Sequence, residues 1–232
     1  MSAVLFRCSS IGKLMTEPKT QKEGQLSVGA KTWIRELVAQ EIFGVDFEVS
    51  SKEMEKGIVC EPDSIALLNR VRGMTLQKNT ERRTDAYFSG ECDLFNAATR
   101  RGHDLKTSWS LKTFPIALAD CKDKVYEYQM RAYMRLWGAD SWSVDYCMVN
   151  TPENLVGYEP LSMHFVDHIP ERMRVTSWVV ERDLDIEAAM VEKVRHARAY
   201  YAEVIAEFDR THGGEPAPIV PYTEQAVAAL DF

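Results

Sequence analysis

The stretch GECDLFNAATRRGHDLKTS, residues 90–108, carries two aspartates and a lysine along two short apolar segments. The polar residues 96–102 separate these segments and include an Arg-Gly turn signal, so the stretch predicts a β-hairpin. A buried charge costs free energy unless something pairs with it. The charged side chains must therefore face water or hold a ligand.

Strand geometry predicts which of these side chains meet. Asp104 and Lys106 are two residues apart, so on a strand they point to the same face, while Leu105 points the opposite way into the core. A loop over residues 96–102 brings Asp93 opposite Asp104, to within about one residue of register. Three ionisable groups are thus expected to converge on one patch.

A divalent cation is the expected occupant of this patch, because two carboxylates on adjacent strands repel each other unless a positive charge lies between them. Oxygen ligands suit Mg²⁺ or Mn²⁺ better than zinc. A neighbouring lysine can orient a water and stabilise the charge that develops during phosphodiester hydrolysis. The alternative is an exposed polar face of the hairpin, on which Asp93, Asp104 and Lys106 are simply solvated.

The hydrophobic pattern of the whole chain predicts an α/β protein. We expect helices over residues 29–43, 51–72, 123–137 and 184–210, the second broken or kinked at Pro62, and strands over residues 86–95, 103–109, 141–150, 163–169 and 175–182. This order implies a single domain over residues 1–210, with a mixed sheet covered by helices. The Pro-rich residues 211–232 are expected to form a C-terminal extension.

Net charge, the length of apolar runs and the cysteine content argue against several classes of protein. The net charge of −7 argues against loose electrostatic coating of nucleic acid or membrane, although local cations and bound metals can still attract phosphates to one site. No apolar run approaches the roughly 20 residues of a membrane span, so we expect a cytoplasmic protein. Five scattered cysteines predict reduced, buried thiols rather than disulfides or a zinc or iron–sulfur site.

Four short motifs follow one another along the chain: Gly57-x3-Glu61, Gly90-x2-Asp93, Asp104-Leu105-Lys106 and Gln129-x3-Tyr133. In this order and spacing the chain resembles the PD-(D/E)XK nuclease superfamily over about residues 5–205. It is most similar to the phage-type alkaline exonucleases, the lambda exonuclease and YqaJ viral recombinase group, with RecB-type nuclease domains as relatives. The resemblance implies a restriction-endonuclease-like core with a central mixed β-sheet flanked by helices.

The resemblance also implies roles for particular residues. The implied metal ligands are Glu61, Asp93, Asp104 and the carbonyl of Leu105. Lys106 would position the attacking water, and Gln129 would support the site from the helix behind it. In FRCSSIGKLM the implied contacts to DNA phosphates are Arg7, Ser9 and Ser10. One departure is Asp104, where the lambda exonuclease branch usually has a glutamate.

The implied activity is a Mg²⁺-dependent deoxyribonuclease, with Mn²⁺ able to substitute, that digests linear duplex DNA from its ends, from 5′ to 3′, in phage recombination or repair. The resemblance further implies a ring-shaped homotrimer, a single-strand annealing protein as a partner, and the cytoplasm of a bacterial host or phage-infected cell. Two alternatives stay open: a related endonuclease, and a nuclease-like factor that binds DNA or a partner without turnover.

Each candidate residue also has a plain structural interpretation. Glu61 could be a surface acid of its helix, and Gln129 with Tyr133 could be ordinary surface and core positions. Ser9 or Ser10 could cap a short helix that begins at Ile11. We expect a structural role for two further groups, His164 with His168, and Tyr200 with Tyr201. The basic runs are expected to be solvated, with no role assigned to the loop residues Arg100 and Arg101.

Overall fold

The computed structural model describes residues 4–47 and 49–213. Among these, residues 5–12 and 50–188 form one compact unit, and residues 4, 13–47, 49 and 189–213 form a second. Each unit is described by itself. Residues 214–232, most of the expected C-terminal extension, lie outside the described residues, and the boundary at residue 210 stays a prediction.

The second unit contains helix α1 (Val28–Phe43) and most of the long helix α6 (Leu184–His212). The Ser27 hydroxyl accepts a hydrogen bond from the Ala30 amide and caps α1, and Gly44 ends it in the left-handed conformation. Both helices confirm the sequence expectation. Tyr201 is buried and hydrogen-bonds to Glu41, and the Tyr200 hydroxyl accepts from Arg35, so both tyrosines have structural partners.

The first unit contains the other α-helices. They are α2 (Lys52–Val59), α3 (Glu61–Arg72), α4 (Lys124–Trp137) and α5 (Glu153–Val156). The expected break in residues 51–72 is confirmed and falls at Cys60. Pro62 therefore lies in the first turn of α3, where the backbone N–H that proline lacks would have no helical partner. As a result, Glu61 begins a helix instead of lying in the middle of one.

Short 3₁₀ helices connect these elements at Cys8–Lys13, Gln21–Glu23, Leu118–Cys121, Leu161–Met163 and Glu171–Met173.

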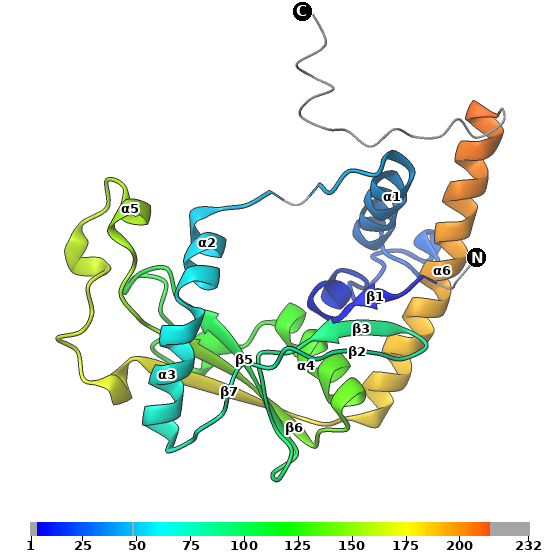
Figure 1. Ribbon diagram of the computed structural model, residues 1–232. Helices are drawn as coiled ribbons and strands as arrows, with labels where there is room; N and C mark the ends of the chain where they lie inside the picture. The colour runs from blue at the N-terminus through cyan, green and yellow to red at the C-terminus, as the bar shows by residue number, and fades with distance from the viewer. Residues whose placement is uncertain (1–3, 48, 214–232) are drawn as a thin grey trace, which may run out of the picture. The chain divides into compact units, whose positions relative to one another are not determined.

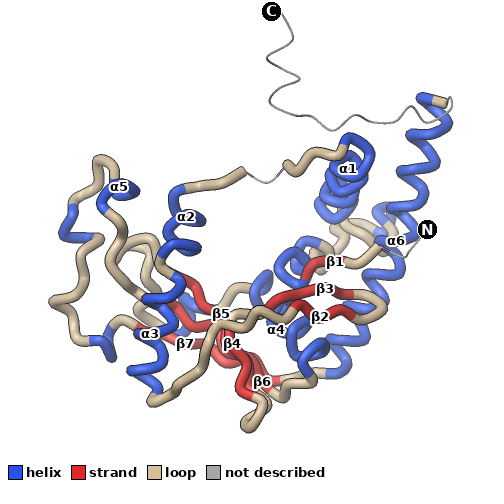
Figure 2. The backbone as a smooth tube through the Cα atoms, in the orientation of Figure 1, coloured by secondary structure: helices blue, strands red, loops and turns tan. Residues whose placement is uncertain are grey.

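Two mixed sheets form the centre of the first unit (Figures 1 and 2). The first has the order β1-β3-β2, from β1 (Phe6–Arg7), β2 (Arg82–Thr84) and β3 (Phe88–Glu91). The second has the order β4-β5-β6-β7, from β4 (Leu94–Asn96), β5 (Arg101–Thr107), β6 (Ser141–Cys147) and β7 (Val175–Glu181). The α/β class with mixed pairing is confirmed. The expected strand over residues 86–95 is divided between the sheets at Cys92 and Asp93.

Helices α3 and α4 pack on opposite faces of the second sheet. Under α3 lies an apolar cluster that includes Leu67, Leu94 and Cys147, with Leu105 packed at its edge. The face toward α4 carries Trp142, whose ring contacts those of Tyr133 and Trp137. Because side chains alternate along a strand, Asp104 and Lys106 share the α4 face and His103 shares the α3 face.

The expected strand over residues 163–169 is wrong. This segment forms the end of a 3₁₀ helix and a series of turns. Its residues pair with no strand of the two described sheets, although β7 leaves one edge of the second sheet unpaired. Instead, the Val166 amide donates to the Asn150 side chain, and the buried His164 ring hydrogen-bonds to Thr151. His164 therefore has the structural role that we expected.

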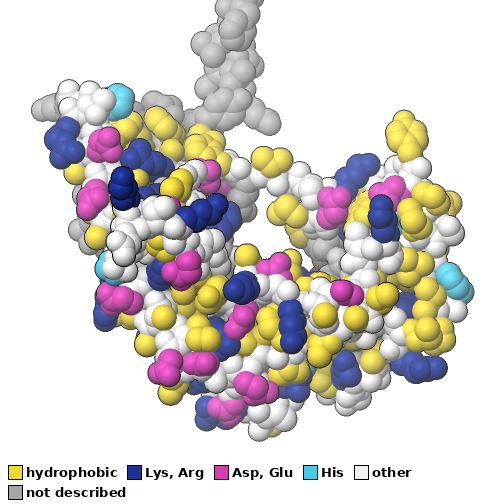
Figure 3. Space-filling model, turned by 180° about the vertical axis from the view of Figure 1, so that it is seen from behind, with side chains coloured by type: hydrophobic (Ala, Val, Ile, Leu, Met, Phe, Trp, Pro, Cys, Tyr) yellow, Lys and Arg dark blue, Asp and Glu magenta, His cyan; other side chains and the backbone are white. Residues whose placement is uncertain are grey.

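The remaining compositional expectations can be compared with the part of the chain that the structure describes. All five cysteines are free and buried, as expected. No described helix is long and apolar enough to cross a membrane. Figure 3 shows acidic and basic side chains interspersed with hydrophobic ones on the face that it draws.

Gly102 on β5 leaves room for the ring of Trp142 on β6, so replacing Gly102 should destabilise the protein. A Cβ atom at Gly102 would lie 2.2 Å from a ring atom of the fully buried Trp142. We expect Gly102→Ala to lower the free energy of unfolding by about 1–3 kcal/mol, measured by urea denaturation. Gly57→Ala is the matched control, since its Cβ would meet nothing within 4 Å and α2 should tolerate it. Equal stability of the two variants would contradict this packing.

Candidate active site

The hairpin pairs in the register that the sequence predicts. Leu94 pairs with His103 and Asn96 with Arg101, so the next position in register sets Asp93 against Asp104. Strand β4 begins at Leu94, and Asp93 lies one residue before it. At this position the Asp93 side chain, and not a strand backbone, pairs with β5: its Oδ2 accepts a hydrogen bond of 2.7 Å from the Leu105 amide.

This hydrogen bond also fixes the direction of the Leu105 carbonyl. In an extended strand the N–H and C=O of one residue point toward the same edge. Since the Leu105 N–H points toward Asp93, its carbonyl faces the same side, where β4 offers no pairing residue. The Leu105 side chain points the other way, against the apolar cluster under α3, as predicted.

Asp104 is the most deeply buried acid of the candidate site, at 3% exposure. Its Oδ1 accepts a hydrogen bond of 3.0 Å from Gln129 Nε2 on α4, and its Oδ2 lies 2.8 Å from the Lys106 ammonium. That contact is an ion pair without hydrogen-bond geometry, so Oδ2 has no hydrogen-bond partner among the described residues. Burial raises the pKa of Asp104 to about 6, against the opposing effect of Lys106, and the charge on Asp93 adds to the rise.

Lys106 is held between a carboxylate and an aromatic ring. Its Nζ lies 4.4 Å from the centre of the Tyr126 ring on α4, which adds a cation–π contact to the ion pair with Asp104. Burial lowers the pKa of Lys106, but the Asp104 carboxylate outweighs this, so the pKa lies above its ordinary value. The side chain is therefore a fixed positive charge at neutral pH.

Gln129 connects the buried acid to the first sheet. Its Nε2 also donates to the Tyr133 hydroxyl at 3.3 Å, and that hydroxyl donates to the Glu91 carbonyl of β3 at 3.0 Å. Gly90 makes this approach feasible, because a Cβ there would lie 2.7 Å from Cys8 Sγ and 2.8 Å from the Tyr133 ring. Gln129 is buried, so its interpretation as a helix-surface residue is wrong.

A single lysine, Lys78, pairs with both Glu61 and Asp93. Lys78 Nζ lies 2.5 Å from Glu61 Oε1 and 2.9 Å from Asp93 Oδ1. Within the described residues, no three His, Cys, Asp or Glu side chains form a group able to hold a metal, and between Glu61 and Asp93 the charge is balanced by this ammonium. No local pattern marks Lys78, since its partners come from α3 and the hairpin.

The residues still suit a hard divalent cation by their chemistry. Asp104 presents a buried carboxylate oxygen that lacks a hydrogen-bond partner, and Asp93 lies in register beside it. Every predicted ligand offers oxygen, the donor that Mg²⁺ and Mn²⁺ prefer. The Lys106 ammonium, 2.8 Å from Asp104 Oδ2, offsets part of the cost of burying this charge, and a divalent ion held by the same carboxylate would offset more.

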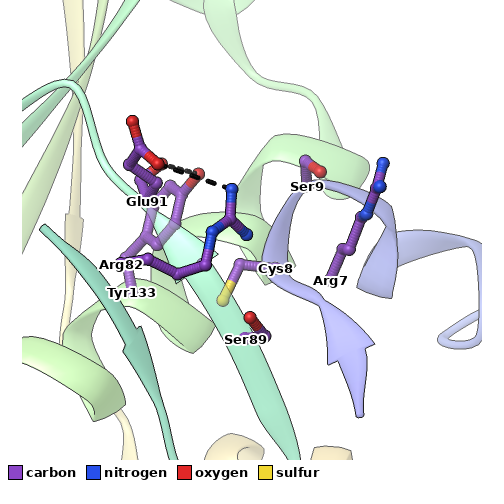
Figure 4. A pocket seen from close by; sticks show the side chains of 8 residues that line it. Arg7, Cys8, Ser9, Arg82, Ser89, Glu91 and Tyr133 are labelled. Atoms are coloured by element: carbon purple, nitrogen blue, oxygen red, sulfur yellow. Dashed lines mark hydrogen bonds and ion pairs between the residues drawn. The ribbon is translucent and has the colours of Figure 1, made fainter. Parts of the chain in front are cut away.

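The expected DNA-binding segment lines a pocket of about 200 Å³. Figure 4 shows Arg7 and Ser9 on one side of it, and Arg82, Glu91 and Tyr133 on the other. Arg82 pairs with Glu91 at 3.4 Å.

Ser10 does not line this pocket. The 3₁₀ helix begins at Cys8, before both serines, so the alternative that Ser9 or Ser10 caps a helix starting at Ile11 is wrong. Tyr133 lines the pocket and accepts a hydrogen bond from Gln129, so Tyr133 and Gln129 connect the pocket to the buried Asp104.

Comparison with solved structures shows what the chain resembles. A phage-related exonuclease from Haemophilus somnus 129PT matches with a TM-score of 0.84 and 32% sequence identity, over 89% of this chain and 97% of that one. An alkaline exonuclease from Laribacter hongkongensis, LHK-Exo, shares the fold at a TM-score of 0.63 and 19% identity, over 90% of this chain and 91% of that one. The complex of LHK-Exo with dAMP matches at a TM-score of 0.62 and 20% identity, over 90% and 93%. Family models and curated proteins give no match.

Proposed function

Because the chain belongs to the lambda exonuclease and YqaJ-like group of nucleases, we propose that it is a DNA exonuclease that hydrolyses phosphodiester bonds from the ends of linear duplex DNA. The observation that carries the proposal is the arrangement of charged side chains on one face of β5. On β5, Lys106 lies 2.8 Å from the buried Asp104, and Asp93 lies in register beside them. This arrangement gathers two acids and a fixed cation where an anionic substrate can be attacked.

Mg²⁺ is the proposed cofactor, with Mn²⁺ able to substitute. Asp93, Asp104 and the Leu105 carbonyl would hold it, with Glu61 as a further ligand, although Glu61 is paired with Lys78 in this structure. When bound, such an ion neutralises charge on the scissile phosphate and makes a neighbouring water a better nucleophile.

The side chains of the site provide the remaining chemistry. Lys106 supplies N–H donors and a positive charge on the face of Asp104, which suits it to hold the attacking water and to stabilise the charge that develops on the phosphate. Gln129 fixes the orientation of the Asp104 carboxylate and acts as a positioning residue. Arg7, Ser9 and Ser10 are proposed to contact DNA phosphates, with Arg7 and Ser9 doing so from the pocket that they line.

Several finer features belong to the same proposal. Digestion would run from 5′ to 3′ and serve phage-type recombination or repair, in the cytoplasm of a bacterial host or a phage-infected cell. A ring-shaped homotrimer would let an acidic protein stay on its substrate by enclosing it, since the net charge of −7 does not favour loose attraction to DNA. A single-strand annealing protein would take over the exposed strand.

The proposal is tested with two DNA topologies. Linear duplex DNA and covalently closed circular DNA are incubated with the protein and Mg²⁺, with and without a chelator, and the released nucleotides are measured. We expect degradation of the linear DNA alone, abolished by the chelator. Nicking of the closed circle would identify an endonuclease instead. Binding without degradation in both Mg²⁺ and Mn²⁺ would identify a factor without turnover.

A further inference from the structure

A second cavity lies on the α3 face of the β4-β5-β6-β7 sheet, the face opposite Asp104 and Lys106. Its volume is about 490 Å³, within the range of small-ligand sites. The strand residues Asn96, Arg101, His103, Asp145 and Ser177 line it, together with residues that follow or end α3. The cavity shares no lining residue with the pocket of Arg7 and Ser9.

The Asp145 carboxylate lines this cavity, and both of its oxygens already accept hydrogen bonds from neighbouring side chains. Asp145 is 1% exposed, and its Oδ2 lies 2.8 Å from His103 Nδ1. Its Oδ1 accepts hydrogen bonds from the Ser143 hydroxyl at 2.8 Å and the Ser177 hydroxyl at 2.5 Å. Donors from three strands therefore satisfy Asp145, and it leaves little capacity to hold a cationic ligand.

The two arginines of the cavity are donors with unused capacity. Arg101 makes no side-chain hydrogen bond or ion pair within the described residues, and its Nε is buried without a partner. Arg72 donates from Nη2 to the Ser177 hydroxyl, which uses one of its five N–H groups. His103 uses its Nδ1–H for Asp145, and in the neutral ring the Nε2 atom is then an acceptor, so His103 adds no donor to the cavity.

The hairpin turn supports the same conclusion. Asn96 Oδ1 accepts from the amides of Ala98 and Thr99, which leaves the Asn96 amide nitrogen as a donor. Arg100, with a φ of +50°, pairs with Asp140 outside the cavity at 2.9 Å. The next residue, Arg101, is on the alternate face and lines the cavity.

From this excess of donors we propose that the cavity binds a phosphate group, up to the size of a mononucleotide. Arg72 and Arg101 face one buried carboxylate that His103, Ser143 and Ser177 already satisfy. Arginine guanidinium groups match phosphate oxygens in geometry and charge. The phosphate can come from a free 5′-nucleotide or from a DNA strand, and the inference does not depend on the proposed nuclease activity.

Calorimetric titration of the full chain in chelator tests this inference. The ligands are inorganic phosphate, dAMP and a short single-stranded oligonucleotide, and the proteins are wild type, Arg101→Gln, Arg72→Gln and Arg100→Gln. We expect Arg101→Gln and Arg72→Gln each to weaken binding by at least about tenfold, as loss of a charged donor predicts. Arg100→Gln, the neighbouring arginine outside the cavity, should bind like wild type.

The pattern of affinities identifies the source of the phosphate. Tighter binding of dAMP than of the oligonucleotide indicates a free nucleotide, and the reverse order indicates a DNA strand. Absence of binding for all three ligands would overturn the inference. So would affinities that are equal in wild type and both cavity variants, because the phosphate would then bind elsewhere.

Discussion

Lys106→Met is expected to lower the rate of DNA digestion by about 10³-fold or more, the largest effect that we predict for a single side chain. The variant loses the fixed ammonium that lies 2.8 Å from Asp104 Oδ2. Asp104→Asn should have a comparable effect, because it removes the negative charge and retains a side chain of similar shape for Gln129 to bond. The measurement is nucleotide release from linear duplex DNA in Mg²⁺.

Two controls separate chemistry from folding in this experiment. Lys112→Met changes an exposed lysine outside the candidate site and should digest DNA like wild type. Circular dichroism and thermal melting should show that Lys106→Met and Asp104→Asn are still folded. Wild-type rates in both site variants would contradict the assignment of this strand face as the catalytic one, even if the protein is a nuclease.

Lys56→Met is expected to lower the free energy of unfolding by about 2–5 kcal/mol, the largest loss of stability that we predict. Lys56 is fully buried, and its ammonium donates to the carbonyls of Ser108, Trp109 and Val149 at 2.7, 3.0 and 3.1 Å. Burial lowers its pKa to about 8, so the group remains charged at pH 7. Methionine would leave these three acceptors without their donor.

Through these hydrogen bonds Lys56 holds α2 against the residues that follow β5. It therefore also helps to position the start of α3, where Glu61 lies. Urea denaturation measures the loss, and Lys52→Met serves as the matched control. Lys52 begins the same helix but is exposed, so its replacement should change stability by no more than about 0.5 kcal/mol. Equal midpoints for the two variants would show that the buried ammonium contributes nothing to folding.

The hairpin could be predicted because its geometry is local. The spacing of Asp104 and Lys106 fixes a common face, and the length of the loop between the strands fixes the register that sets Asp93 against Asp104. Helix α4 follows from its hydrophobic period. The position of Gln129 on it, facing the acid, followed only from a resemblance to a family of known fold.

The buried lysines could not be predicted, since their partners are distant in sequence. Lys56 bonds a carbonyl 93 residues away, and Lys78 joins Glu61 to Asp93 from a loop. Lysine is ordinarily exposed, so composition argues against such positions. The prediction of a strand over residues 163–169 failed for a related reason: the Val166 amide and the His164 ring hydrogen-bond to the side chains of Asn150 and Thr151, and alternation does not reveal such partners.

Arg101, which the sequence left without a role, illustrates the same limit. Alternation predicts its face, but the cavity that it lines requires Asp145 and Ser177 from β6 and β7. The sequence places these residues more than 40 positions away, and only the folded sheet brings them together.

We propose that Asp93 and Asp104 hold a divalent metal ion for phosphodiester hydrolysis, and a crystal soaked in Mn²⁺ tests this most directly. Anomalous scattering from manganese is located without reference to activity. We predict a peak within about 2.0–2.6 Å of carboxylate oxygens from both Asp93 and Asp104, and no peak in a crystal of Asp104→Asn. A manganese peak elsewhere in the wild-type crystal, with none between these two aspartates, would contradict the account.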